Sequence, residues 1–176
     1  AKLVRRHPHV FGNVEVGGSD EVIRNWDAIK ATEKTNRPLL DDIPRALPAL
    51  MGAERVSSRV AKVGFDWPDA SGSREKVSEE LRELDEAVAL GDPQQIEAEL
   101  GDVLFALVNL ARHHGVDAER ALGKTSDRFR ARFEHVEARV RDAHGDWPRD
   151  ERGKPTRGLT LEELDLYWEE AKLRTR

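Results

Sequence analysis

The sequence contains no cysteine, which excludes disulfide bonds and zinc sites built from thiolates. Aromatic residues are also scarce, at 6% of the chain. No apolar run approaches the roughly 20 residues that a membrane-spanning helix needs. No secretory signal is visible at the start of the sequence. We therefore expect a cytoplasmic protein that does not bind membranes.

The charge balance argues against a nucleic-acid-binding protein. The 34 Asp and Glu residues outnumber the 29 Lys and Arg residues, which gives a formal net charge of −5. A negatively charged surface does not favour binding to the phosphate backbone of a nucleic acid, although a local basic face can still hold a single phosphate group. A chain of 176 residues with 36% charged and 38% hydrophobic residues is typical of one ordinary domain built from solvated helices.

Hydrophobic residues recur at helical spacing along most of the chain. The clearest stripe begins at Val77 and ends at Val88, and a second begins at Ile96 and ends at Ala111. The residues Gly91-Asp92-Pro93 separate these two helices, because Asp92 is a good N-cap and proline suits the first helical position. The sequence therefore predicts a helical hairpin with a tight turn.

Further helices are predicted after Ser19, Pro48, Asp117 and Thr160, and an irregular loop is predicted over residues 145–158. No segment shows the alternation of polar and apolar residues that is typical of a strand. The expected fold class is all-α, a bundle of helical hairpins.

Two pairs of acidic residues flank the predicted turn at Gly91. The members of each pair, Glu80 with Glu83 and Glu99 with Asp102, are three positions apart and share one helix face. Glu80 and Asp102 are equally far from Gly91, as are Glu83 and Glu99, so an antiparallel hairpin brings the two pairs level. Four crowded carboxylates raise one another's pKa, and a hard divalent cation such as Mg²⁺ relieves their repulsion.

Spacing alone does not decide between a metal site and an acidic surface, because solvated acids on helix flanks are common. The mirrored placement about Gly91 is the feature that favours a metal site. Glu79 points nearly away from the apolar stripe of its helix, so by geometry it is the weakest candidate.

Several motifs resemble those of the MazG type of all-α nucleoside triphosphate pyrophosphohydrolases. The acidic motifs EELRE at residues 79–83 and ELGD at residues 99–102 resemble the metal-binding signature of that superfamily. Three further stretches resemble MazG more specifically: VGFDWP at 63–68, GDVLFA at 101–106 and VNLARH at 108–113. RHPHVFG at 6–12 is similar to the stretch that closes the first half of that two-part family. The resemblance covers nearly the whole chain.

This resemblance implies Mg²⁺-dependent hydrolysis of nucleoside triphosphates, NTP or dNTP, to the monophosphate and pyrophosphate, as in the house-cleaning of nucleotide pools. Mg²⁺ held by Glu80, Glu83, Glu99 and Asp102 would polarise phosphate oxygens and activate an attacking water. Either Glu79 or Glu83 would serve as the general base, and spacing does not choose between them.

The resemblance also implies substrate contacts nearer the C-terminus. Arg128 and Arg132 would clamp phosphate oxygens, Lys172 would reach a phosphate and assist catalysis, and Trp168 would close the nucleotide pocket. Without the resemblance, solvated arginines, a snorkelling lysine and a core tryptophan explain these residues equally well. Ser126 stands where the family pattern has asparagine, and Arg128 stands where lysine is common.

The resemblance also bears on domain organisation. The family has an earlier copy of the acidic motif upstream of the RHPHVFG stretch, and this sequence begins downstream of that copy. We expect residues 1–45 to be an N-terminal arm and helix, the remnant of an upstream half, and residues 46–176 to be the all-α catalytic domain. Wide apolar stripes, together with the resemblance, predict a homodimer that pairs the hairpins into a four-helix-type bundle.

Two other functions stay open from the sequence, and a third, a di-iron bundle, is disfavoured because the Glu-x-x-His pairs expected there are absent. One is a related pyrophosphohydrolase that acts on dUTP or phosphoribosyl-ATP, and the other is a non-catalytic helical module that binds a partner. The sequence contains no P-loop and no dinucleotide-binding fingerprint. Assays with a panel of substrates would distinguish the first alternative from an enzyme that acts on NTP or dNTP. Release of pyrophosphate by this chain alone would exclude the second, the non-catalytic module.

Overall fold

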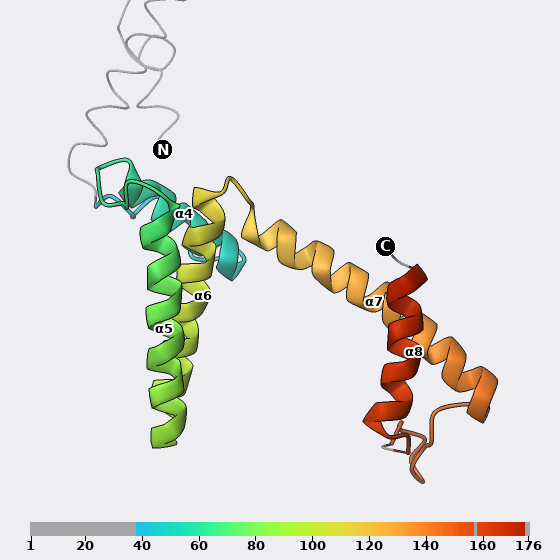
Figure 1. Cartoon of the computed structure of the whole chain (residues 1–176). Helices are drawn as coiled ribbons and strands as arrows, with labels where there is room; N and C mark the ends of the chain where they lie inside the picture. Colours follow the sequence, from blue (N-terminus) through green and yellow to red (C-terminus); the bar gives the residue numbers. More distant parts are fainter. Residues whose placement is uncertain (1–37, 157, 175–176) are drawn as a thin grey trace, which may run out of the picture. The chain divides into compact units, whose positions relative to one another are not determined.

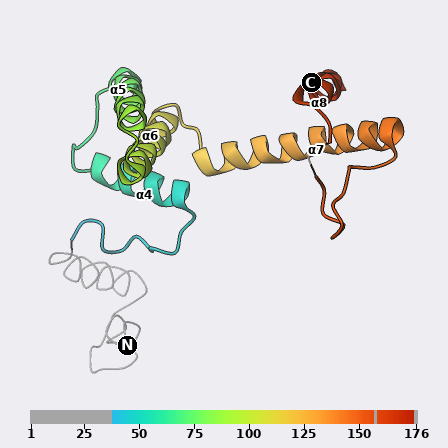
Figure 2. The same cartoon turned by 90° about the horizontal axis from the view of Figure 1, so that it is seen from below.

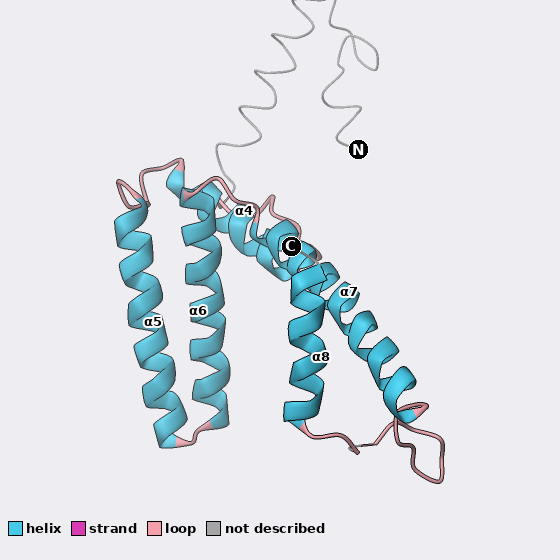
Figure 3. Ribbon diagram, turned by 45° about the vertical axis from the view of Figure 1, so that its right-hand side comes forward, coloured by secondary structure: helices cyan, strands magenta, loops and turns pink. Residues whose placement is uncertain are grey.

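The computed structural model describes residues 38–156 and 158–174, and this part of the chain consists of helices, turns and loops (Figures 1 and 3). Its helices, in chain order, are α4 (Ala49–Ala61), α5 (Ala70–Leu90), α6 (Pro93–His113), α7 (Ala118–His144) and α8 (Leu161–Arg174). The predicted all-α class is confirmed for these residues. The helix predicted after Ser19 and the stretch at residues 6–12 lie outside the described residues.

Contacts divide the described residues into two units. The first unit contains residues 38–47 and 55–66, and the second contains residues 48–54, 67–156 and 158–174. Among the described helices, none combines the length and the apolar character that a membrane span requires.

Helices α5 and α6 form a hairpin, and they lie side by side in both views (Figures 1 and 2). Gly91 adopts a left-handed conformation with φ of 72° and ends α5, where a side chain would add strain. Asp92 then accepts a hydrogen bond from the backbone N–H of Gln94 at 3.0 Å, and Pro93 is the first residue of α6. The turn predicted from the sequence is confirmed.

Small side chains fill the interface of this hairpin. Val77 and Ala87 of α5 and Val103 and Ala106 of α6 are buried. Because α5 and α6 each have 21 residues, the two helices run beside each other over their full lengths. The hairpin is therefore a regular support for side chains on its flanks.

Helices α7 and α8 form a second hairpin, with Val136, Val140 and Ala171 buried in it. The side chain of Asp117 caps α7 by accepting a hydrogen bond from the Arg120 N–H at 2.9 Å. A reciprocal capping box begins α8, since the Thr160 N–H donates to Glu163 and the Glu163 N–H donates back to the Thr160 hydroxyl. Both predicted helix starts are confirmed.

Candidate functional site

Three carboxylates converge on one flank of the α5–α6 hairpin. Glu80 and Glu83 lie one turn apart on α5, and Glu99 lies on α6. Each offers an oxygen atom, and these atoms lie within 4.8 Å of one another. This arrangement follows from the sequence, because the antiparallel hairpin sets Glu83 and Glu99 level across the turn. A cluster of oxygen donors at this spacing suits a hard divalent cation.

Asp102, the fourth predicted ligand, lies outside that group of three and is exposed. It still acts on the cluster, since its charge helps to raise the pKa of Glu99. It lies one turn beyond Glu99 on α6, so it belongs to the same acidic flank.

The pKa of Glu99 is raised from its ordinary value of 4.5. Partial burial is the largest cause, followed by the negative charges of Glu83, Asp102 and Glu80, whereas Lys76 opposes the shift. The acidic flank is therefore electrostatically unfavourable without a counter-charge, and a bound cation would reverse this effect.

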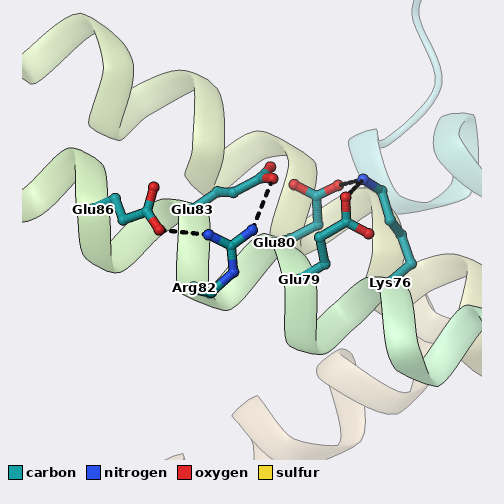
Figure 4. A network of polar contacts seen from close by, with 6 residues as sticks. All are labelled: Lys76, Glu79, Glu80, Arg82, Glu83 and Glu86. Carbon is teal, nitrogen blue, oxygen red and sulfur yellow. Dashed lines mark hydrogen bonds and ion pairs between the residues drawn. The ribbon is translucent and has the colours of Figure 1, made fainter.

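Lys76 supplies one counter-charge within the protein (Figure 4). Its Nζ lies 2.7 Å from a carboxylate oxygen of Glu80 and 3.0 Å from one of Glu79. Glu80 is only 5% exposed, so this ion pair compensates a buried negative charge. The two carboxylates raise the pKa of Lys76 above its usual range and keep it charged.

Sequence reasoning did not single out Lys76. The signal was present, because Lys76 stands three positions before Glu79 and four before Glu80, which is the spacing of helical ion pairs. Such spacings are frequent in a chain that is 36% charged, so they do not mark a site by themselves.

Arg82 makes a second ion pair on the outer side of α5 (Figure 4). Its guanidinium contacts Glu86 at 2.5 Å and Glu83 more loosely at 3.5 Å. The Glu86 side chain is 63% exposed, as its position opposite the apolar stripe predicts. Glu79 is also half exposed, at 49% of its side chain, and its described ion pair is with Lys76.

The predicted substrate-binding residues lie on the other hairpin. The guanidinium of Arg132 on α7 lies 5.9 Å from the ring centroid of Trp168 on α8, a cation–π distance. The Phe129 ring also packs on Trp168, with centroids 4.8 Å apart. The structure therefore brings Arg132 and Trp168 together.

Arg128 and Lys172 make contacts within their own helices. Arg128 donates a hydrogen bond to the Thr125 hydroxyl at 3.0 Å, and Lys172 forms an ion pair with Glu169. Phe129, which the sequence analysis did not single out, is 55% exposed beside Trp168. Its exposure could not be read from helical spacing alone.

Comparison with known proteins extends these observations. Residues 71–137 match the model of the MazG nucleotide pyrophosphohydrolase domain. Over 97% of its length the chain is 43% identical to the nucleoside triphosphate pyrophosphohydrolase of Escherichia coli K12, and it spans 64% of that relative. It is 42% identical to the nucleoside triphosphate pyrophosphohydrolase/pyrophosphatase MazG of Thermotoga maritima and spans 62% of it.

A third relative has a different length. The chain is 43% identical over 174 residues to the uncharacterized protein YabN of Bacillus subtilis, of which it spans 34%. The chain thus spans less than two thirds of the curated relatives that it matches most fully. The matched residues 71–137 include the whole acidic flank of the α5–α6 hairpin.

Proposed function

We propose that the chain is a MazG-type nucleotide pyrophosphohydrolase, the domain whose model residues 71–137 match, and that it hydrolyses nucleoside triphosphates to the monophosphate and pyrophosphate. The observation that carries this proposal is the convergence of Glu80, Glu83 and Glu99 on one hairpin flank, with oxygen atoms within 4.8 Å. We further propose that the protein acts in the cytoplasm and that its role is the removal of unwanted nucleotides.

The donor set fits Mg²⁺. All the donors are carboxylate oxygens, and the raised pKa of Glu99 marks a site that favours an added positive charge. Glu80, Glu83 and Glu99 would hold the ion, with Asp102 as the fourth ligand after a side-chain rotation. When bound, Mg²⁺ supplies charge neutralisation at the phosphate oxygens and lowers the pKa of a coordinated water.

The protein's own residues would perform the remaining steps. Glu79 and Glu83 are the two candidates for accepting the proton of the attacking water, and Glu79 is the better placed to remain free of metal, because it lies outside the three-carboxylate group. Arg128, Arg132 and Lys172 would neutralise charge on the departing pyrophosphate. The Arg132–Trp168 contact supports a pocket in which a charged and an aromatic surface meet.

A homodimer completes the proposal. Five apolar side chains of the α5–α6 hairpin are between 44% and 56% exposed: Leu81, Val88, Leu100, Leu104 and Leu107. Helical spacing places them on a different flank of the hairpin from the carboxylates. An apolar face of this kind needs a cover, and a second copy of the hairpin would bury it in a four-helix-type bundle.

The decisive experiment incubates the purified chain with Mg²⁺ and each NTP and dNTP, together with dUTP and phosphoribosyl-ATP, and identifies the products. We expect a nucleoside monophosphate and pyrophosphate in equal amounts, and no reaction in excess EDTA. Preference for dUTP or phosphoribosyl-ATP would identify the chain as a related pyrophosphohydrolase with a different substrate. No turnover on any substrate by the folded chain would favour a non-catalytic helical module, which the exposed apolar face would also suit.

A further inference from the structure

A cleft lies in the first unit, away in sequence from the acidic flank. Its volume is about 330 Å³. It is formed by the turns before α4 and by the second half of that helix, and it is lined by Asp42, Ile43, Pro44, Leu47, Arg55, Ser58, Arg59 and Lys62. None of these residues has a part in the hydrolysis proposed above.

One wall of the cleft is basic. Arg55, Arg59 and Lys62 follow one another at intervals of four and three positions, so they share one face of α4 and the turn after it. A single carboxylate, Asp42, lines the same cleft. The lining therefore carries an excess of positive charge in a chain whose net charge is −5.

The three cations are not equivalent. Arg59 is held in place, because its guanidinium contacts both oxygens of Asp42, at 2.5 and 3.1 Å, and donates to the Leu39 carbonyl at 3.1 Å. Its bonds to Asp42 raise its pKa. Within residues 38–156 and 158–174, no carboxylate pairs with Arg55 or Lys62. Arg59 is thus a fixed support, and the other two cations are available to a ligand.

The lining also includes three apolar residues, here called the apolar wall. Ile43 and Leu47 are half-buried, and Pro44 lies between them in the sequence. A combination of an apolar wall with a few convergent polar groups is the usual character of a small-molecule site. The volume lies near the lower end of the usual range of about 300–1,000 Å³, which fits a ligand of the size of a mononucleotide.

A simpler explanation accounts for part of this pattern. Cations near the last turn of a helix offset its dipole, and Arg59 stands in the last turn of α4. That explanation does not cover Arg55, which lies earlier in the helix, nor the apolar residues that line the same cleft.

We infer that this cleft is a second ligand site, which binds a small organic phosphate of the size of a nucleoside monophosphate. Arg55 and Lys62 contact the phosphate, and Ser58, which also lines the cleft, is a further hydrogen-bond donor. The ring system of the ligand lies against Ile43, Pro44 and Leu47. Binding here needs no divalent cation and does not depend on whether the acidic flank hydrolyses a triphosphate.

Calorimetric titration of the full chain with AMP in excess EDTA tests this inference. We expect saturable binding that weakens as salt is raised, because charge attraction supplies part of the affinity. Inorganic phosphate and adenosine, used as separate probes, should each bind more weakly than AMP, since each offers only one half of the ligand. Equal binding of phosphate and AMP would reduce the site to a bare anion site and overturn the role of the apolar wall.

Variants locate the site. Arg55→Gln and Lys62→Gln should each weaken AMP binding by roughly tenfold, the loss expected for one charge-assisted hydrogen bond. Both side chains are exposed, so folding should survive, and circular dichroism checks this. Arg45→Gln is the matched control, because Arg45 is an exposed cation in the same unit that does not line the cleft.

A second readout separates this site from the acidic flank. In methyl NMR spectra, AMP should shift the signals of Ile43 and Leu47 and leave those of Leu104 on α6 unchanged. Unchanged affinity in the Arg55→Gln/Lys62→Gln double variant would overturn the inference. So would loss of EDTA-resistant binding in Glu80→Gln, which would place the ligand on the acidic flank.

Discussion

At the scale of single residues, the acidic flank combines a buried carboxylate with partly exposed neighbours. The negative charge of each carboxylate is disfavoured for a different physical reason. Glu80 is 5% exposed and forms an ion pair with Lys76. The pKa of Glu99 is raised by partial burial and by the neighbouring carboxylates. A buried charge that is paired within the protein can be released to a metal only if its partner is displaced or shared. In the metal-free protein, the ammonium of Lys76 therefore stabilises the buried charge of Glu80 until a metal binds.

Substitution of the carboxylates tests their proposed role. Glu80→Gln, Glu83→Gln, Glu99→Gln and Asp102→Asn should each lower kcat/KM by at least the roughly 10- to 100-fold that loss of a metal-supporting group costs. Folding should persist, because the changes at Glu83, Glu99 and Asp102 remove a charge from a repelling cluster. In Glu80→Gln, Lys76 keeps its ion pair with Glu79. Turnover, Mg²⁺ titration and circular dichroism are measured for each variant.

Glu86→Gln is the control for this series, since Glu86 is on the same helix but 63% exposed and paired with Arg82. It should leave turnover nearly unchanged. Full activity in folded Glu80→Gln and Asp102→Asn would mean that the hairpin flank is not the metal site.

Lys76→Met should change metal binding in the opposite direction. Removal of the ammonium 2.7 Å from Glu80 removes a competitor for that carboxylate, so Mg²⁺ should bind more tightly in the absence of nucleotide. The same variant should be less stable without metal, because Glu80 would then be buried without its cation. Titration calorimetry with Mg²⁺ and thermal unfolding with and without Mg²⁺ measure both effects. Weaker Mg²⁺ binding would assign Lys76 a supporting role instead.

At the scale of helices, the α5–α6 turn is the feature that sets the acidic pairs level. Gly91 has a left-handed φ of 72°, and alanine there should destabilise the protein by about 1 kcal/mol. Gly123 makes the matched comparison, because it lies inside α7, past the first turn, with open space where a Cβ would lie, and alanine there should stabilise by up to about 1 kcal/mol. Urea unfolding of both variants measures these changes, and equal effects would contradict the role of the turn.

The N-cap of α5 gives a pH-dependent prediction. Bonds from the Ser71 hydroxyl and N–H hold the pKa of Asp69 below its ordinary value of 3.8. Because the folded-state pKa is depressed, this stabilisation is complete above the unfolded-state pKa and is lost as pH falls through the folded-state value. Asp69→Asn keeps a capping oxygen and should unfold with a weaker pH dependence below about pH 4 in urea titrations. If the pH dependence of the free energy of unfolding is the same in the variant, Asp69 does not contribute to it.

The sequence predicted the elements that depend on local chemistry. Asp92, Asp117 and Thr160 all begin helices where they were expected, because capping needs only neighbours in sequence. The level placement of Glu83 and Glu99 was also predictable, since a tight turn fixes the register of a hairpin. Whether Asp102 joins Glu99 depends on side-chain rotation, which spacing does not determine.

Features that depend on tertiary contact were not predictable. Trp67 lies against Gly72 at the start of α5, so closely that a Cβ on residue 72 would clash with its ring, and no pattern in the sequence announces that contact. The cleft beside α4 combines residues 42–47 with a helix face that comes later in the chain. This contact depends on how the turns at residues 42–47 fold back on α4, which the sequence pattern does not give. The assignment of residues 1–45 to an upstream half stays a prediction.

At the scale of the whole molecule, the exposed apolar face of the α5–α6 hairpin is the feature that a single chain leaves unexplained. Leucines on that face lie on a different flank from the carboxylates, so a second copy could cover the face without closing the acidic flank. Isologous pairing of this kind gives a closed dimer.

Charge on this face should therefore separate the subunits. Leu104→Glu and Leu107→Glu together should convert a dimer to a monomer at micromolar concentration, because each buries a carboxylate in an apolar interface. Leu166→Glu is the control, since Leu166 is 69% exposed on α8 and outside that hairpin. Multi-angle light scattering measures the mass of each variant. A wild-type chain that is already a monomer would contradict the dimer, and a double variant that stays dimeric would move the interface away from the α5–α6 hairpin.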